Sequence, residues 1–107
     1  MKCYVGRLEG LVGGVYVGDS PLDPRLDLRN YRSTGFEWGH GGRGPSQLAL
    51  ALLADHFDDD QKADELHLYF KWEVVATLPK EGWTLTAEQI TQALESLAIR
   101  LKRAEAV

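Results

Sequence analysis

The sequence predicts an α+β fold in which a small N-terminal antiparallel β-hairpin or sheet packs with about three α-helices. Three observations predict it. Short runs of Val, Tyr and Cys alternate with polar or small residues near the N-terminus. The second half of the chain instead repeats apolar residues at helical spacing. A length of 107 residues, 44% of them hydrophobic and 26% charged, suits a single domain with its own core.

We therefore expect one domain over residues 1–107. It consists of a β-rich part (1–34), a glycine-rich loop (35–44) and a helical part (45–104).

Within the β-rich part, residues 2–7 and 14–17 read as strands, and the glycine-rich connection 9–14 predicts a hairpin with a loose loop. The alternation of charged residues and leucines at 25–29 favours one more edge strand with its leucines pointing inward.

The first helix is expected from Pro45 to about Phe57, because proline suits a first helical turn. Its faces are apolar nearly all round, which is typical of a central buried helix. The second helix is expected over about 59–77, after an aspartate run that supplies its cap. Its β-branched end at 74–78 leaves helix and strand open as alternatives.

The segment 83–86 is expected to lead into a third helix, because Thr86 to Gln89 matches a capping box. An apolar stripe follows at helical spacing, formed by Ile90, Leu94, Leu97 and Leu101. This stripe packs on the domain or forms a homodimer seam. The residues expected in the core are Leu48, Leu52, Leu53, Phe70 and Leu94.

Residues 35–48, G-F-E-W-G-H-G-G-R-G-P-S-Q-L, hold five of the eleven glycines. Part of this stretch matches GxGxxG, but the chain lacks the repeated βαβ units of a dinucleotide-binding domain. Read as a P-loop, it has Pro45 where lysine is required, which argues against nucleotide triphosphate hydrolysis.

Two interpretations of this stretch remain. In the first it binds a phosphate or carboxylate attached to a planar group. The free amides of Ser46 to Leu48 and the cation of Arg43 would hold the anion, and aromatic rings would stack on the planar group. In the second the glycines solve a steric problem and let Trp38 fold under the first helix. The candidate binding residues are Trp38, His40, Gly41, Gly42, Arg43, Gly44 and Ser46.

The formal net charge is −4, and the acidic excess lies in residues 46–107. The sequence shows no basic stripe, so we expect no direct nucleic-acid binding. An acidic surface favours basic partners, including the basic faces of proteins that themselves bind nucleic acid. The candidate partner-binding acids are Asp58, Asp59, Asp60 and Asp64.

No complete catalytic motif is present, so we expect a non-enzymatic protein without a cofactor. The histidines lack metal-ligand spacing and the aspartate run lacks the pattern of a calcium loop, so we expect no metal site. We also expect no membrane span and no signal peptide. A lone cysteine, Cys3, suits the reducing cytoplasm.

Residues 35–56, together with F-K-W-E-V-V-A-T-L-P and W-T-L-T further on, carry a resemblance over about residues 24–92. The chain resembles a family of small uncharacterised bacterial, plasmid and phage proteins, known only as a domain of unknown function. The family motif runs tryptophan-glycine-aromatic-glycine-glycine-x-glycine-proline into QLALA, and His40 stands here in place of its aromatic residue. The helix after Leu94 extends beyond the usual end. The resemblance implies no established activity, but it implies cytosolic proteins carried on mobile elements.

That setting and the charge distribution together predict a counter-defence inhibitor of the anti-CRISPR type. It would bind a host protein through its acidic surface. The alternative is a protein that sequesters or senses a small anionic ligand, such as a nucleotide signal, at the glycine-rich loop.

Overall fold

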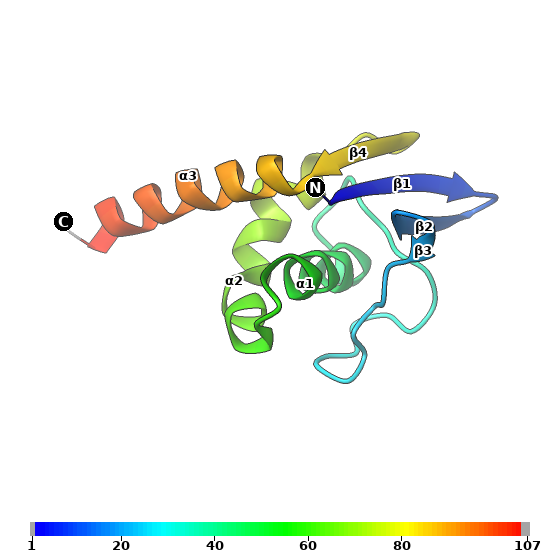
Figure 1. The fold of residues 1–107 in the computed structure, drawn as a ribbon, viewed down its shortest axis with the longest axis horizontal. Coiled ribbons are helices and arrows are strands. Elements are labelled where there is room, and N and C mark those ends of the chain that lie inside the picture. Colours follow the sequence, from blue (N-terminus) through cyan, green and yellow to red (C-terminus); the bar gives the residue numbers. More distant parts are fainter. Residues whose placement is uncertain (1, 106–107) are drawn as a thin grey trace.

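The computed structural model describes residues 2–105 and has the expected α+β architecture (Figure 1). Its elements in chain order are β1 (Cys3–Glu9), β2 (Val12–Val17), β3 (Ser20–Pro21), α1 (Arg43–Phe57), α2 (Asp60–Glu73), the 3-10 turn η1 (Val75–Thr77), β4 (Gly82–Thr86) and α3 (Ala87–Glu105). The strands form one antiparallel sheet in the order β3-β2-β1-β4.

The hairpin of β1 and β2 is tighter than the sequence suggested. Glu9 pairs with Val12, so only Gly10 and Leu11 form the turn. Gly10 has a φ of +69°, a backbone conformation that glycine adopts without steric cost. The expected loose loop was therefore wrong, because its second half joins β2.

The strand β4 was not expected from the sequence, which predicted only a lead into the third helix. It pairs with β1 along its length, placing Trp83 opposite Gly6 and Leu85 opposite Tyr4. Trp83 and Leu85 are buried, whereas Thr84 between them is exposed, as in a sheet with one buried face. The pairing joins segments that lie far apart in the chain, and no local pattern in a five-residue segment predicts it.

The free edge of β4 is shortened by the start of α3. Ala87 donates its N–H to the carbonyl of Lys2, so the N–H of the preceding Thr86 points away from β1. Gln89 Oε1 accepts that N–H, and Thr86 Oγ1 accepts the N–H of Gln89. The expected capping box is thus confirmed, and it also covers part of a sheet edge.

The core lies between the sheet and α1, with α2 packed against α1 (Figure 1). Of the five expected core residues, four are fully buried: Leu48, Leu52, Leu53 and Phe70. Leu94 is only half-buried. The reason is the course of α3, which touches the domain through Ile90 and Leu97 and then extends beyond it (Figure 1).

The expected edge strand at 25–29 is wrong. Arg25 has a φ of +57°, and its carbonyl accepts the N–H groups of Leu28 and Arg29, which closes a turn. Its guanidinium binds the carboxylates of Asp27 and Asp60. These contacts hold the segment away from the sheet, and the third strand is β3 instead.

Two helix boundaries also differ from expectation. The helix α1 begins at Arg43 rather than Pro45, with Gly42 as its N-cap. The helix α2 ends at Glu73, and the segment left open between helix and strand contains the 3-10 turn η1. Leu78 is extended because it precedes Pro79, which disfavours the helical conformation there.

Candidate functional site

The glycine-rich segment is tightly packed between β2, α1 and α2. Gly39 has a φ of +81° and donates its N–H to the carbonyl of Val75. A Cβ on Gly41 would overlap the ring of Trp72, and one on Gly44 would overlap the side chain of Glu37. At least three of the five glycines therefore have a structural reason to be glycine.

The N-terminus of α1 has no side-chain cap, but other groups of the protein pack closely against its first turn. Ser46 is 3% exposed and donates its N–H to the carbonyl of Gly42, so the expected free amide at this position is wrong. The side chain of Glu37 lies against Gly44 in the first turn of α1, so its charge would oppose an anion at this helix end. Its carboxylate lies 3.7 Å from Arg32 and 3.6 Å from His40.

Arg43 is also used within the fold. Its Nε donates to the carbonyl of Tyr31 at 3.0 Å and a terminal nitrogen reaches the carbonyl of Asn30. Its guanidinium lies 5.8 Å from the Tyr31 ring centre. The side chain is exposed at the surface, yet its role includes holding the loop before it.

Of the three aromatic rings expected to form a stacking surface, two are buried: Trp38 is 5% exposed and Phe36 7%. The third, Tyr31, is half-buried. The indole of Trp38 donates to the carbonyl of Pro79 and meets Trp83 edge to face at 5.5 Å between ring centres. This placement matches the second interpretation of the segment, in which the glycines let Trp38 fold inward.

The aspartate run has divided roles. Asp59 caps α2 by accepting the N–H of Lys62. Asp60 binds Arg25 through two hydrogen bonds, and Asp64 binds Arg29 in the same way. The hydrogen bond from Arg29 holds the pKa of Asp64 below its usual value. Asp58 is exposed at the C-cap of α1 with a left-handed backbone, φ +54°.

A pair of buried polar residues went unnoticed in the sequence. Gln47 is fully buried in α1, and its amide makes hydrogen bonds to Pro24 O, Arg29 O, Tyr31 N and Arg32 N. His67 is 1% exposed, accepts from the Tyr31 hydroxyl at Nε2 and donates from Nδ1 to the Asp64 carbonyl. Burial lowers the pKa of His67. Together they fasten the loop between β3 and α1 to the helices.

The exposed face of α2 carries the most conspicuous surface residues. Trp72 is 63% exposed, Tyr69 49% and Leu68 46%. They share this face with Glu65, also exposed, at i, i+3, i+4 and i+7 spacing. We call these four residues the α2 ridge. The sequence does not assign these residues to a surface, since periodicity alone does not say which side of a helix faces solvent.

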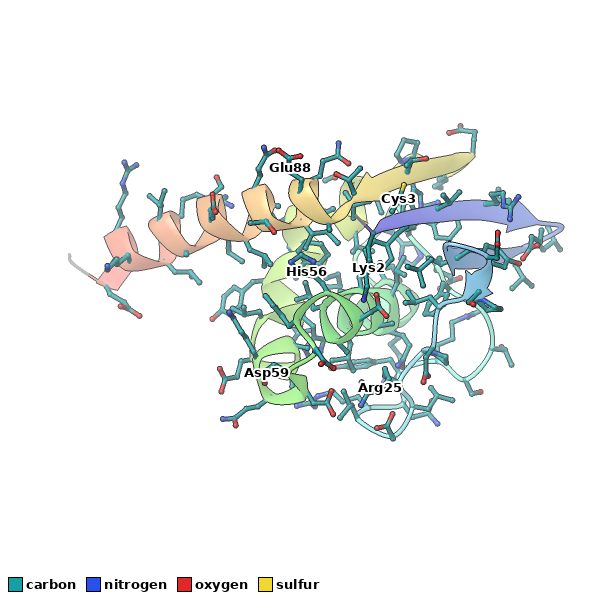
Figure 2. All side chains as sticks on the ribbon, in the orientation of Figure 1. Lys2, Cys3, Arg25, His56, Asp59 and Glu88 are labelled. Carbon is teal, nitrogen blue, oxygen red and sulfur yellow. The ribbon has the colours of Figure 1, made fainter. Side chains whose placement is uncertain are left out.

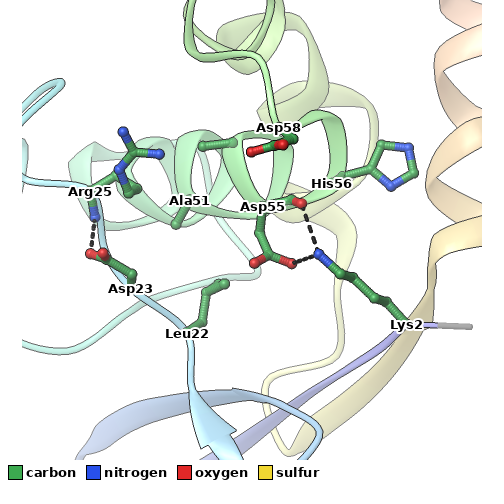
Figure 3. Close-up of a pocket in the computed structure, with 9 residues that line it drawn as sticks. Lys2, Leu22, Asp23, Arg25, Ala51, Asp55, His56 and Asp58 are labelled. Atoms are coloured by element: carbon green, nitrogen blue, oxygen red, sulfur yellow. Dashed lines mark hydrogen bonds and ion pairs between the residues drawn. The ribbon is translucent and has the colours of Figure 1, made fainter.

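An open cavity of about 530 Å³ lies at the C-terminal end of α1 (Figure 3). Its floor is formed by the apolar side chains of Leu22, Ala51 and Ala54. Charged residues from separate segments surround it: Lys2, Asp23, Arg25, Asp55 and Asp58, together with His56. In the wider view of Figure 2, Lys2 and His56 appear between the ribbons of α1 and α3.

The cavity wall contains a connected polar network. Lys2 Nζ donates to both Asp55 Oδ2 and the Asp55 carbonyl at 3.1 Å. The buried Tyr4 hydroxyl donates to the same Asp55 oxygen at 2.6 Å. Burial, then this hydrogen bond, raises the pKa of Tyr4. Burial, followed by the charge of Lys2, lowers the pKa of His56, so its ring is neutral at pH 7.

Residues 2–105 contain neither a cluster of potential metal ligands nor a membrane-spanning helix. No group of three or more His, Cys, Asp or Glu side chains in this range could hold a metal ion. No helix within it is long and apolar enough to cross a bilayer.

The fold and its surfaces define a small α+β protein with an internally bonded glycine-rich segment, an exposed aromatic ridge and a polar cavity. The chain belongs to a family of unknown function, DUF6166, whose model matches residues 4–96. Neither a curated protein nor a solved structure matches it.

Proposed function

We propose that this chain is a non-enzymatic protein that binds a basic surface of another protein through the α2 ridge. The observation that carries the proposal is the exposure of Trp72. Tryptophan and tyrosine contribute strongly to binding at protein interfaces. Covering a large exposed apolar ring with a partner lowers the free energy, because apolar surface is removed from water.

The ring of Trp72 is held in place before any partner arrives. Its edge rests on Gly41, where any side chain would displace it. Lys71 is buried beside it, with Nζ donating to the Gly41 carbonyl at 3.0 Å and lying 4.6 Å from the Trp72 ring centre. A ring that is already oriented loses less entropy on binding, which is a property of effective interface residues.

Acidic residues accompany the ridge and suit a basic partner. Glu65 belongs to the ridge itself, and Asp58 and Asp59 are exposed in the turn before α2. Asp60 and Asp64 are paired with arginines of their own chain, so they contribute less free charge. Acids at the rim of an interface accelerate association and lose this effect in salt.

The finer form of the proposal concerns the partner. We propose a cytoplasmic host protein whose basic surface serves nucleic-acid binding, occupied here as a means of counter-defence. The acidic excess of residues 46–107 supports a basic partner, and the setting comes from the resemblance of the sequence to proteins of mobile elements. Direct binding of DNA or RNA at physiological salt would contradict this form.

The alternative proposal, an anionic ligand at the glycine-rich segment, has less support from the geometry. The side chain of Glu37 lies against the first turn of α1, where its charge would oppose such a ligand. Trp38 is not available for stacking because it is buried. His40 and Arg43 remain at the surface and could contact a partner at the margin of the ridge.

The test compares two truncations of exposed apolar residues. The tagged chain, Trp72→Ala and the control Ile99→Ala on α3 (55% exposed) are used to capture proteins from host extract, with quantitative mass spectrometry. We expect Trp72→Ala to weaken capture of a basic protein at least about tenfold, as for an interface hot spot. Ile99→Ala should capture it like the unaltered chain.

Both variants should keep the unfolding midpoint of the unaltered chain, because both side chains are largely exposed. Equal capture by all three proteins, or equal loss in both variants, would show that the ridge is not the binding surface.

A further inference from the structure

The cavity at the C-terminal end of α1 has a second feature besides its size. Its floor is apolar and formed by Leu22, Ala51 and Ala54, of which Leu22 and Ala54 keep a small exposed fraction of 4% each. Its rim is charged, and Lys2, Asp23 and Asp58 in it are exposed. This combination matches a long cationic side chain, which lays its methylene stem on apolar surface and keeps its charged head among polar groups.

The charge at the rim is negative once internal pairs are taken into account. The guanidinium of Arg25 is turned to Asp27 and Asp60, neither of which lines the cavity. The ammonium of Lys2 forms an ion pair with Asp55. Asp58 adds an exposed carboxylate, and Asp23 adds another that accepts only a backbone N–H, from Arg25.

The backbone adds to the negative charge of the cavity. The cavity lies at the C-terminus of α1, where the last carbonyls carry partial negative charge. The chain's own Lys2 shows that this end accepts a cation, because its Nζ binds a helix carbonyl and a carboxylate of Asp55 together (Figure 3).

We propose that this cavity is a socket for an arginine side chain of the partner protein, with its stem on Leu22 and Ala54 and its guanidinium between Asp23 and Asp58. Arginine fits better than lysine because its planar fork can bind two carboxylates at once. The inference rests on the proposed function, since it names a side chain that a basic partner inserts.

The experiment titrates the full chain with N-acetyl-arginine amide and follows backbone amides by NMR. N-acetyl-citrulline amide, which has nearly the same shape without the charge, is the control ligand. We expect saturable shifts at Leu22, Ala54 and Asp58 with the arginine compound only.

Two substitutions make a matched pair. Asp58→Asn removes a rim carboxylate, and asparagine tolerates the left-handed backbone at this position. Asp19→Asn removes the same charge from an exposed turn residue outside the cavity, and asparagine is as suited to turns as aspartate. Asp58→Asn should weaken binding about two- to fivefold, the range of an exposed ion pair, and Asp19→Asn should leave it unchanged.

Equal shifts with the citrulline compound, or equal effects of the two substitutions, would overturn the proposal. Tighter binding of free arginine than of its blocked amide would also overturn it, in favour of a small-molecule site. Capture through Trp72 reports on the α2 ridge alone. A chain that fails this titration but keeps ridge-dependent capture therefore refutes the socket and leaves the proposed function standing.

Discussion

The glycine-rich segment and the α2 ridge lie in contact, yet their side chains are used in opposite ways. In the segment, the polar side chains interact with the protein itself. Trp38 donates a hydrogen bond to Pro79 and Arg43 to Tyr31, and Glu37 lies beside Gly44. On the ridge, Trp72 and Tyr69 are left in water. The comparison shows that a cluster of unusual residues can be architecture, while an ordinary amphipathic helix supplies the surface.

The two regions are connected through Gly41. It belongs to the glycine-rich segment, and the Trp72 ring packs against it. The segment therefore contributes to function in our proposal by shaping the ridge, without touching a ligand at its centre. Four predictions separate the two roles, in order of decreasing expected effect on stability.

The largest effect is expected at Gln47, which fastens the loop before the glycine-rich segment. Gln47→Leu removes four hydrogen bonds and leaves part-buried backbone groups without these partners. Each such group costs about 1–3 kcal/mol, so we expect unfolding free energy to fall by about 3 kcal/mol or more. Urea denaturation measures it, with the exposed Gln61→Leu as a control that should change little. Equal effects would mean that the amide network is not what holds the loop.

A second prediction separates two glycines of the same segment. Gly44→Ala would force a Cβ against the side chain of Glu37 near its own backbone, at a cost of about 1–3 kcal/mol. Gly41→Ala would displace the far end of the largely exposed Trp72 ring from its position on Gly41, without a clash against the backbone. It should therefore change stability less and partner capture more than Gly44→Ala does. The reverse pattern would contradict the assignment of Gly41 to the ridge.

A smaller effect is expected for Arg43→Gln. The substitution loses the hydrogen bond to the Tyr31 carbonyl, worth about 0.5–1 kcal/mol at an exposed position. Its melting temperature should fall slightly, whereas a residue that only binds ligand would leave it unchanged. If the melting temperature holds and partner capture is lost, Arg43 belongs to the binding surface instead.

The last prediction concerns pH. Burial lowers the pKa of His67 below its unfolded value of 6.5, so the unfolded chain binds a proton more readily. Its contribution to stability is complete above about pH 6.5 and is lost as the pH falls through the folded pKa. The pKa of His56 is lowered as well, so the comparison uses His56→Gln as the background.

Adding His67→Gln to that background should flatten the loss of stability between pH 7.5 and 5, measured by denaturant midpoints. An unchanged slope would show that His67 is not the responsible group. Asp64 does not interfere, because its pKa is lowered from 3.8 and it titrates below this window.

Features that depend on neighbouring residues are predictable from the sequence alone. The three helices, the first hairpin and the capping box at Thr86 follow from periodicity, turn residues and local hydrogen bonds, which act within a few positions. The tertiary structure decided what depends on distant partners. The pairing of β4 with β1 and the ion pairs of Asp60 and Asp64 with Arg25 and Arg29 all join residues that lie far apart in the chain. The exposure of Trp72 and the burial of Trp38 were decided in the same way. A ring's chemistry is set by its residue type, but its access to solvent is set by what packs against it.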